Sequence, residues 1–70
     1  MLEDGTYDAL VIDATDVDGA VRAELTITSG PHKGEVVVVR GTFPGKASLD
    51  LLAAPATLVV AGGQPTVTLD

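Results

Sequence analysis

The chain has 70 residues, no cysteine, and ten acidic residues against four basic ones, which gives a net charge of −6. This length fits one domain, residues 1–70, that buries roughly 60% of the surface exposed by the unfolded chain. The lack of cysteine excludes disulfides and thiolate metal sites. The negative charge opposes unaided binding to phosphate backbones and to anionic membranes.

Apolar residues make up 46% of the chain, and Tyr7 and Phe43 are its only aromatic residues. A core built from Val, Leu, Ile and Ala is typical of a small β-structure. No stretch reaches the ~18 apolar residues needed to cross a bilayer, and the N-terminal residues lack a basic region followed by an apolar run. We therefore expect a cytoplasmic protein that does not enter membranes.

The first predicted strand covers residues 5–14, in which residues 10–12 are contiguous and apolar on both faces. Such a strand suits a barrel, because it can bend and serve two sheets. The acidic segment 15–19 follows. It is typical of a turn, since Asp side chains bond to nearby backbone and Gly19 tolerates a positive φ.

Residues 24–40 predict a central hairpin. The second strand, residues 20–28, alternates apolar and polar side chains, as expected when one face is buried. Pro31 breaks the regular pattern within the loop that follows. The third strand, residues 35–40, then carries four consecutive valines.

A short helix is predicted over residues 48–54. Ser48 suits the N-cap position, and Pro55 would end the helix after about two turns. Leu49 and Leu52 have the spacing i, i+3 and would face the core. A helix this short depends on such packing, because it is not stable alone.

Residues 56–61 and 65–69 predict the last two strands, joined by a tight turn at Gly-Gly-Gln. The order strand-strand-strand-helix-strand-strand is that of an all-β OB-fold, a five-stranded Greek-key barrel with its helix between strands three and four. An SH3-like barrel is the alternative. It would place its short helical turn before the last strand.

Two motifs carry a family resemblance: residues 5–9 (GTYDA) and residues 27–34 (ITSGPHKG). With them the chain resembles small OB-fold-like domains of phages and bacterial mobile elements, in which a G-x-Y-x-A strand precedes a hairpin of the form T-x-G-x-x-x-G. The resemblance implies single-stranded DNA handling or an accessory role in replication.

Basic and aromatic side chains give the case for a nucleic-acid partner. OB-folds bind single strands across strands two and three and the adjoining loops. The candidates in these segments are Arg22, Lys33, Arg40, Lys46 and Phe43. The acidic turn before strand two would repel phosphates, so single-stranded nucleic acid ranks second as a partner.

The valine run 36–39 predicts a protein-contact surface. Because strand side chains alternate, one pair of valines, either Val36 and Val38 or the other two, must point outward. An apolar strip with a charged rim fits a protein partner or a second copy, which is the favoured function. The predicted binding residues are Arg22, Thr26, Thr28, His32, Lys33, Val36, Val38, Arg40 and Phe43.

The sequence lacks the groupings that catalysis and metal binding need. His32 is the only histidine, and Ser29 and Ser48 are the only serines, with nothing in the fold pattern to bring them together. The acidic segment 13–19 does not match a calcium loop. We predict a protein that is not an enzyme and that uses no metal, no cofactor and no small-molecule substrate.

Overall fold

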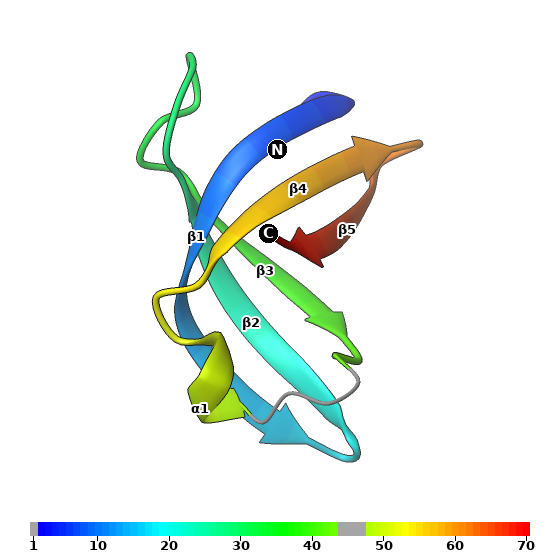
Figure 1. Cartoon of the computed structure of the whole chain (residues 1–70). Coiled ribbons are helices and arrows are strands. Elements are labelled where there is room, and N and C mark those ends of the chain that lie inside the picture. Colours follow the sequence, from blue (N-terminus) through cyan, green and yellow to red (C-terminus); the bar gives the residue numbers. More distant parts are fainter. Residues whose placement is uncertain (1, 44–47) are drawn as a thin grey trace.

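The computed structural model describes residues 2–43 and 48–70, which form five strands and one short helix (Figure 1). The elements are β1 (Gly5–Val17), β2 (Ala20–Ile27), β3 (Val36–Gly41), α1 (Ser48–Leu51), β4 (Pro55–Ala61) and β5 (Gln64–Leu69). This order confirms the predicted order of elements. The helix lies between β3 and β4, which is the OB-fold position and not the SH3-like one.

All five strands join one antiparallel sheet in the order β3-β2-β1-β4-β5. β4 returns to lie beside β1, which makes the first four strands a Greek key. The sheet curls into a half barrel (Figure 1), and its end strands β3 and β5 approach each other. No backbone ladder joins those two strands within the described residues, so the OB-fold-like barrel has an open seam between β3 and β5.

β1 is long enough to serve both halves of the curled sheet. Its first half pairs with β4 and its second half pairs with β2. The register against β2 shifts between Val11 and Asp13, so Ile12 is the extra residue of a β-bulge. A bulge bends a strand and increases its twist. The predicted first strand is confirmed, and the bulge places its bend at Ile12. Only one face is covered there, because Val11 is buried whereas Ile12 is 46% exposed, so the expectation that both faces are covered was wrong.

The turn from β1 to β2 is shorter than the sequence suggested. Asp18 and Gly19 alone form it, with φ angles of 49° and 81°. Asp-Gly is a favoured pair for a two-residue hairpin because both positions need positive φ. Thr15 and Asp16 therefore lie in β1 and pair with β2. The acidic side chains are spread along a strand and are not gathered in a loop.

The core fills the inside of the curled sheet, and α1 contributes one side chain to it. The largest fully buried side chains are Val11, Leu25, Ile27, Leu51 and Leu58. Leu49 is 79% exposed and Leu52 is 43% exposed. The prediction that Leu49 and Leu52 face the core was therefore wrong, and Leu51 takes that place.

The early end of α1 explains this difference. The helix stops at Leu51, and Ala53 has a positive φ of 62°. The N–H of Ala53 donates to the carbonyl of Val11 (2.8 Å), and the N–H of Val11 donates to the carbonyl of Ala54 (3.0 Å). The chain thus leaves the helix to pair with β1, so the i, i+3 spacing of a two-turn helix does not apply.

Candidate functional site

The pairing of β3 with β2 decides which valines face outward. Val37 lies opposite Leu25, whose side chain is fully buried, and Val39 is itself buried. Residues directly opposite each other in a sheet point to the same face. Val36 and Val38 therefore point away from the core, and they are 57% and 46% exposed.

Three cross-strand rows make up the surface that we call the outer face of β2 and β3. From the loop end toward the other end of the strands, the rows are Thr26 with Val36, Glu24 with Val38, and Arg22 with Arg40. A guanidinium nitrogen of Arg22 lies 3.5 Å from a carboxylate oxygen of Glu24. The outer face is therefore apolar at one end and charged at the other.

Thr28, His32 and Lys33 lie beyond these rows, in the loop that joins β2 to β3. A ring nitrogen of His32 pairs with the carboxylate of Glu35. The same ring packs edge-on against Tyr7 of β1, with ring centroids 5.8 Å apart. These contacts give His32 a structural role, since they tie the loop to the first strand.

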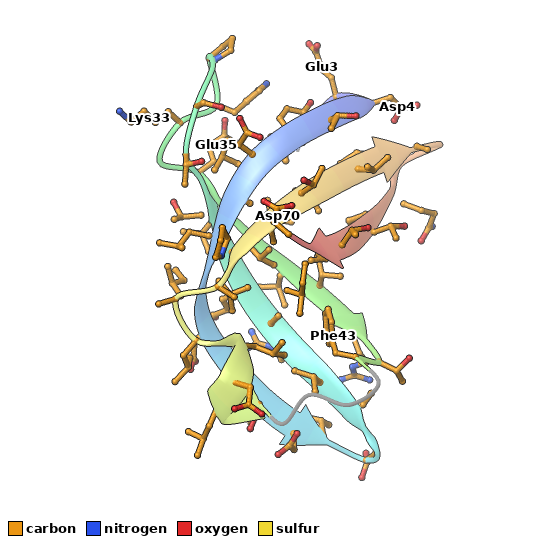
Figure 2. All side chains as sticks on the ribbon, in the orientation of Figure 1. Glu3, Asp4, Lys33, Glu35, Phe43 and Asp70 are labelled. Carbon is orange, nitrogen blue, oxygen red and sulfur yellow. The ribbon has the colours of Figure 1, made fainter. Side chains whose placement is uncertain are left out.

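The described basic side chains do not form one continuous track. Arg22 and Arg40 share one end of the outer face. Lys33, which Figure 2 labels, lies in the loop at the other end. Lys46 lies outside the described residues. Phe43 is half-buried and packs against the core, so the ring is not presented as a free stacking platform.

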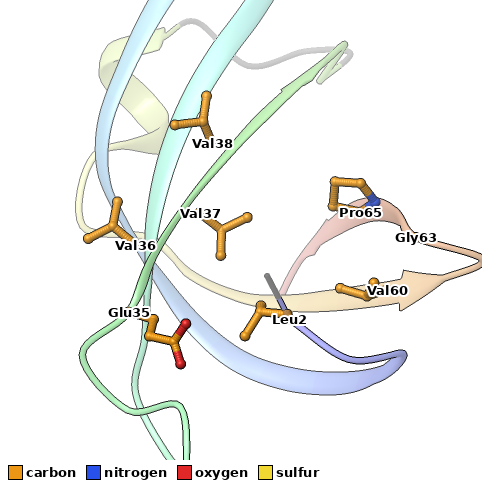
Figure 3. A pocket seen from close by; sticks show the side chains of 8 residues that line it. All are labelled: Leu2, Glu35, Val36, Val37, Val38, Val60, Gly63 and Pro65. Carbon is orange, nitrogen blue, oxygen red and sulfur yellow. The ribbon is translucent and has the colours of Figure 1, made fainter.

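A hollow of about 350 Å³ opens at the seam, between β3 and the β4–β5 hairpin. Its lining includes Leu2, Glu35, Val37, Val60, Gly63 and Pro65 (Figure 3). Val36 and Val38 also belong to the lining; in that view Val37 points toward the β4–β5 hairpin, and Val36 and Val38 point to the other side of β3. The hollow is therefore mostly apolar and adjoins the outer face along β3.

The serine hydroxyls and nearby carboxylates are engaged with one another. Ser29 Oγ donates to Asp8 (3.0 Å), and Ser48 Oγ donates to Asp16 (3.1 Å). In the described part of the chain, no hydrogen bond joins His32 to either serine. Across residues 2–43 and 48–70, no three His, Asp or Glu side chains are grouped to hold a metal ion. The lack of enzyme activity stays a prediction.

Comparisons of the chain with protein-family models, with characterised proteins and with solved structures found no match. Among the described residues, none of the helical segments has the length and apolar character needed to cross a membrane. A functional inference therefore depends on the outer face and on the seam beside it.

Proposed function

We propose that the chain is a cytoplasmic, non-catalytic protein-binding module that makes contact through the outer face of β2 and β3. The observation that carries this proposal is the exposure of Val36 and Val38 on the same face of the same strand. Single exposed valines are ordinary, whereas neighbouring ones on a sheet make an apolar patch that a partner can cover.

The surroundings of the two valines support this reading. Glu24 and the two arginines beside it provide a charged rim next to Val36 and Val38. Protein–protein interfaces combine an apolar centre with a polar rim in this way. A protein or a second copy of the chain is favoured over nucleic acid, because four basic residues on a chain of net charge −6 do not make a broad phosphate-binding track.

Sedimentation across a concentration series tests the proposal. We expect the chain to self-associate, and we expect a Val36→Lys, Val38→Lys double variant to stay monomeric while its circular dichroism is unchanged. Val59→Lys is the matched control, because Val59 is a 37% exposed valine on β4, outside the outer face. Association that survives the double variant but is lost in the control would contradict the proposal.

Single-stranded nucleic-acid binding, as an accessory protein of a phage or mobile element, is the second candidate. One observation favours it: Arg22 and Arg40 lie directly opposite each other. Like charges in such a position repel, and a bound phosphate would relieve the repulsion. Tight oligonucleotide binding that weakens with salt, and that is lost in an Arg22→Glu, Arg40→Glu variant, would make this the first candidate.

A further inference from the structure

The hydrogen bonds at the start of β3 determine which of its backbone groups face β2. Ile27 donates to the carbonyl of Glu35 (2.9 Å) and accepts from the N–H of Gly34 (2.9 Å). In an antiparallel pair, every second residue bonds to the partner strand. Leu25, two residues before Ile27, therefore also bonds to β3, and its partner there is Val37.

The intervening residues of β3 leave their backbone groups unpaired. By the same alternation, Val36, Val38 and Arg40 direct their N–H and C=O groups away from β2, toward the seam. No described strand pairs with them there. A row of unpaired groups on a strand with four valines is a template for pairing with another strand.

The other edge of the seam, on β5, carries a proline at one of its seam-facing positions, whereas the edge of β3 does not. The N–H of Asp70 donates to the carbonyl of Pro55 in β4 (3.2 Å), so the odd-numbered residues of β5 face the seam. Pro65 is one of them, and proline has no N–H to offer a new strand. β3 carries no proline between residues 36 and 41.

We propose that β3 pairs edge to edge, in antiparallel orientation, with β3 of a second copy, so that one sheet runs through both chains. This inference rests on the proposed function and names its partner and its contact. In one register, all three residues whose backbone groups are unpaired, Val36, Val38 and Arg40, find a partner on the other strand. This register places Val38 opposite Val38 of the second copy, and Val36 opposite the second copy's Arg40.

The side chains and spacing of β3 fit a second copy in this register. The residues with unpaired backbone groups, Val36, Val38 and Arg40, have the same spacing on both strands, so the contact is self-complementary about a two-fold axis. Val36 and Val38 of both copies lie on the same face of the joined sheet and form one apolar strip across the axis. An unrelated strand would not supply the matching valines.

Amide hydrogen exchange of the unaltered chain, followed by NMR, tests the pairing directly. At low concentration the amides of Val36, Val38 and Arg40 should exchange fast, while those of Val37 and Val39 are protected by β2. Raising the concentration should slow exchange at the three free positions by about tenfold or more. Face-to-face docking would leave these three N–H groups without a partner strand and would not slow their exchange selectively.

Two proline variants test the same contact by sedimentation. Val38→Pro removes an N–H that none of the described strands of its own chain uses, and we expect the dimer dissociation constant to rise by at least about tenfold. Val67→Pro is the matched control, because it makes the same change on the free edge of β5 and should leave association unchanged. Circular dichroism checks the fold of both, and the exchange measurement decides if either fails to fold.

The outcomes separate this inference from the proposed function. Association that depends on the outward valines but does not slow exchange at Val36, Val38 and Arg40 as the concentration rises would overturn edge pairing and leave the outer face as the contact. A chain that stays monomeric at every concentration would also overturn the inference. Salt-sensitive oligonucleotide binding would instead overturn the proposed function itself. Slower exchange at Val36, Val38 and Arg40 at high concentration, together with loss of association in Val38→Pro, is the result that we expect.

Discussion

Leu51 is the side chain through which α1 contributes to the core, and it is fully buried. Truncating a buried leucine costs its transfer free energy and leaves a cavity, so Leu51→Ala should lower the free energy of unfolding by about 2–5 kcal/mol. Leu52→Ala is the control, with an expected loss within about 1 kcal/mol because Leu52 is largely exposed. Urea unfolding followed by circular dichroism measures both. Equal losses would contradict this assignment.

Asp4 holds the β4–β5 turn from the other end of the sequence. Its carboxylate accepts hydrogen bonds from the N–H groups of Gly62 (3.0 Å) and Gly63 (3.2 Å). Asp4→Ala should therefore lower the free energy of unfolding by about 0.5–1.5 kcal/mol and speed amide exchange at both glycines. Asp4→Asn keeps one acceptor oxygen and should lose less. Unchanged exchange at the glycines in Asp4→Ala would show that the turn does not need this contact.

At the scale of single residues, the sequence limits what can be predicted. The alternation before the turn identified Leu25 and Ile27 as inward residues, and the structure buries both. The valine run could not be assigned in the same way, because four identical side chains carry no alternation. Only the register of Val37 against Leu25 settles which pair faces outward.

The bulge in β1 is the element that lets one strand serve both halves of the barrel. Deleting Ile12 would leave Val11 and Asp13 on their present faces but would straighten the strand, so pairing with β4 should be strained. We expect the deletion to cost clearly more stability than Ile12→Thr, which keeps the bulge and should cost within about 1 kcal/mol. Thermal unfolding of both variants measures the difference. A deletion as mild as the substitution would mean that the bulge is not needed for curling.

At the scale of elements, local sequence patterns correctly predicted the features that depend on residues close together in the sequence. The strands, their order and the position of the helix followed from alternation, turn residues and capping. The length of the helix did not, because α1 ends where Ala53 and Ala54 pair with Val11, more than forty residues earlier in the chain. The hollow at the seam was missed for the same reason, since Leu2 and Val60 meet there only through the fold. Pro65 in the last strand was its one sequence signal.

At the scale of the whole molecule, the charge of the chain separates the two candidate functions. Both copies in a dimer carry a net charge of −6, so they repel at long range. Salt screens this repulsion, with a Debye length of about 10 Å at 0.1 M, and leaves the burial of valines and the pairing of backbone groups largely unaffected. Nucleic-acid binding behaves in the opposite way, because salt weakens it steeply through counterion release.

We therefore predict that raising sodium chloride from about 0.02 M to about 0.3 M strengthens self-association, by several-fold in the dimer dissociation constant, and weakens any binding of a single-stranded oligonucleotide. Sedimentation and fluorescence anisotropy on the same preparation measure the two responses. An Arg40→Gln variant is the control, since it removes the one cationic side chain of β3 and should keep the sign of the salt effect. Self-association that falls steeply with salt would mean that contacts between opposite charges hold the copies together. That result would contradict an interface centred on Val36 and Val38.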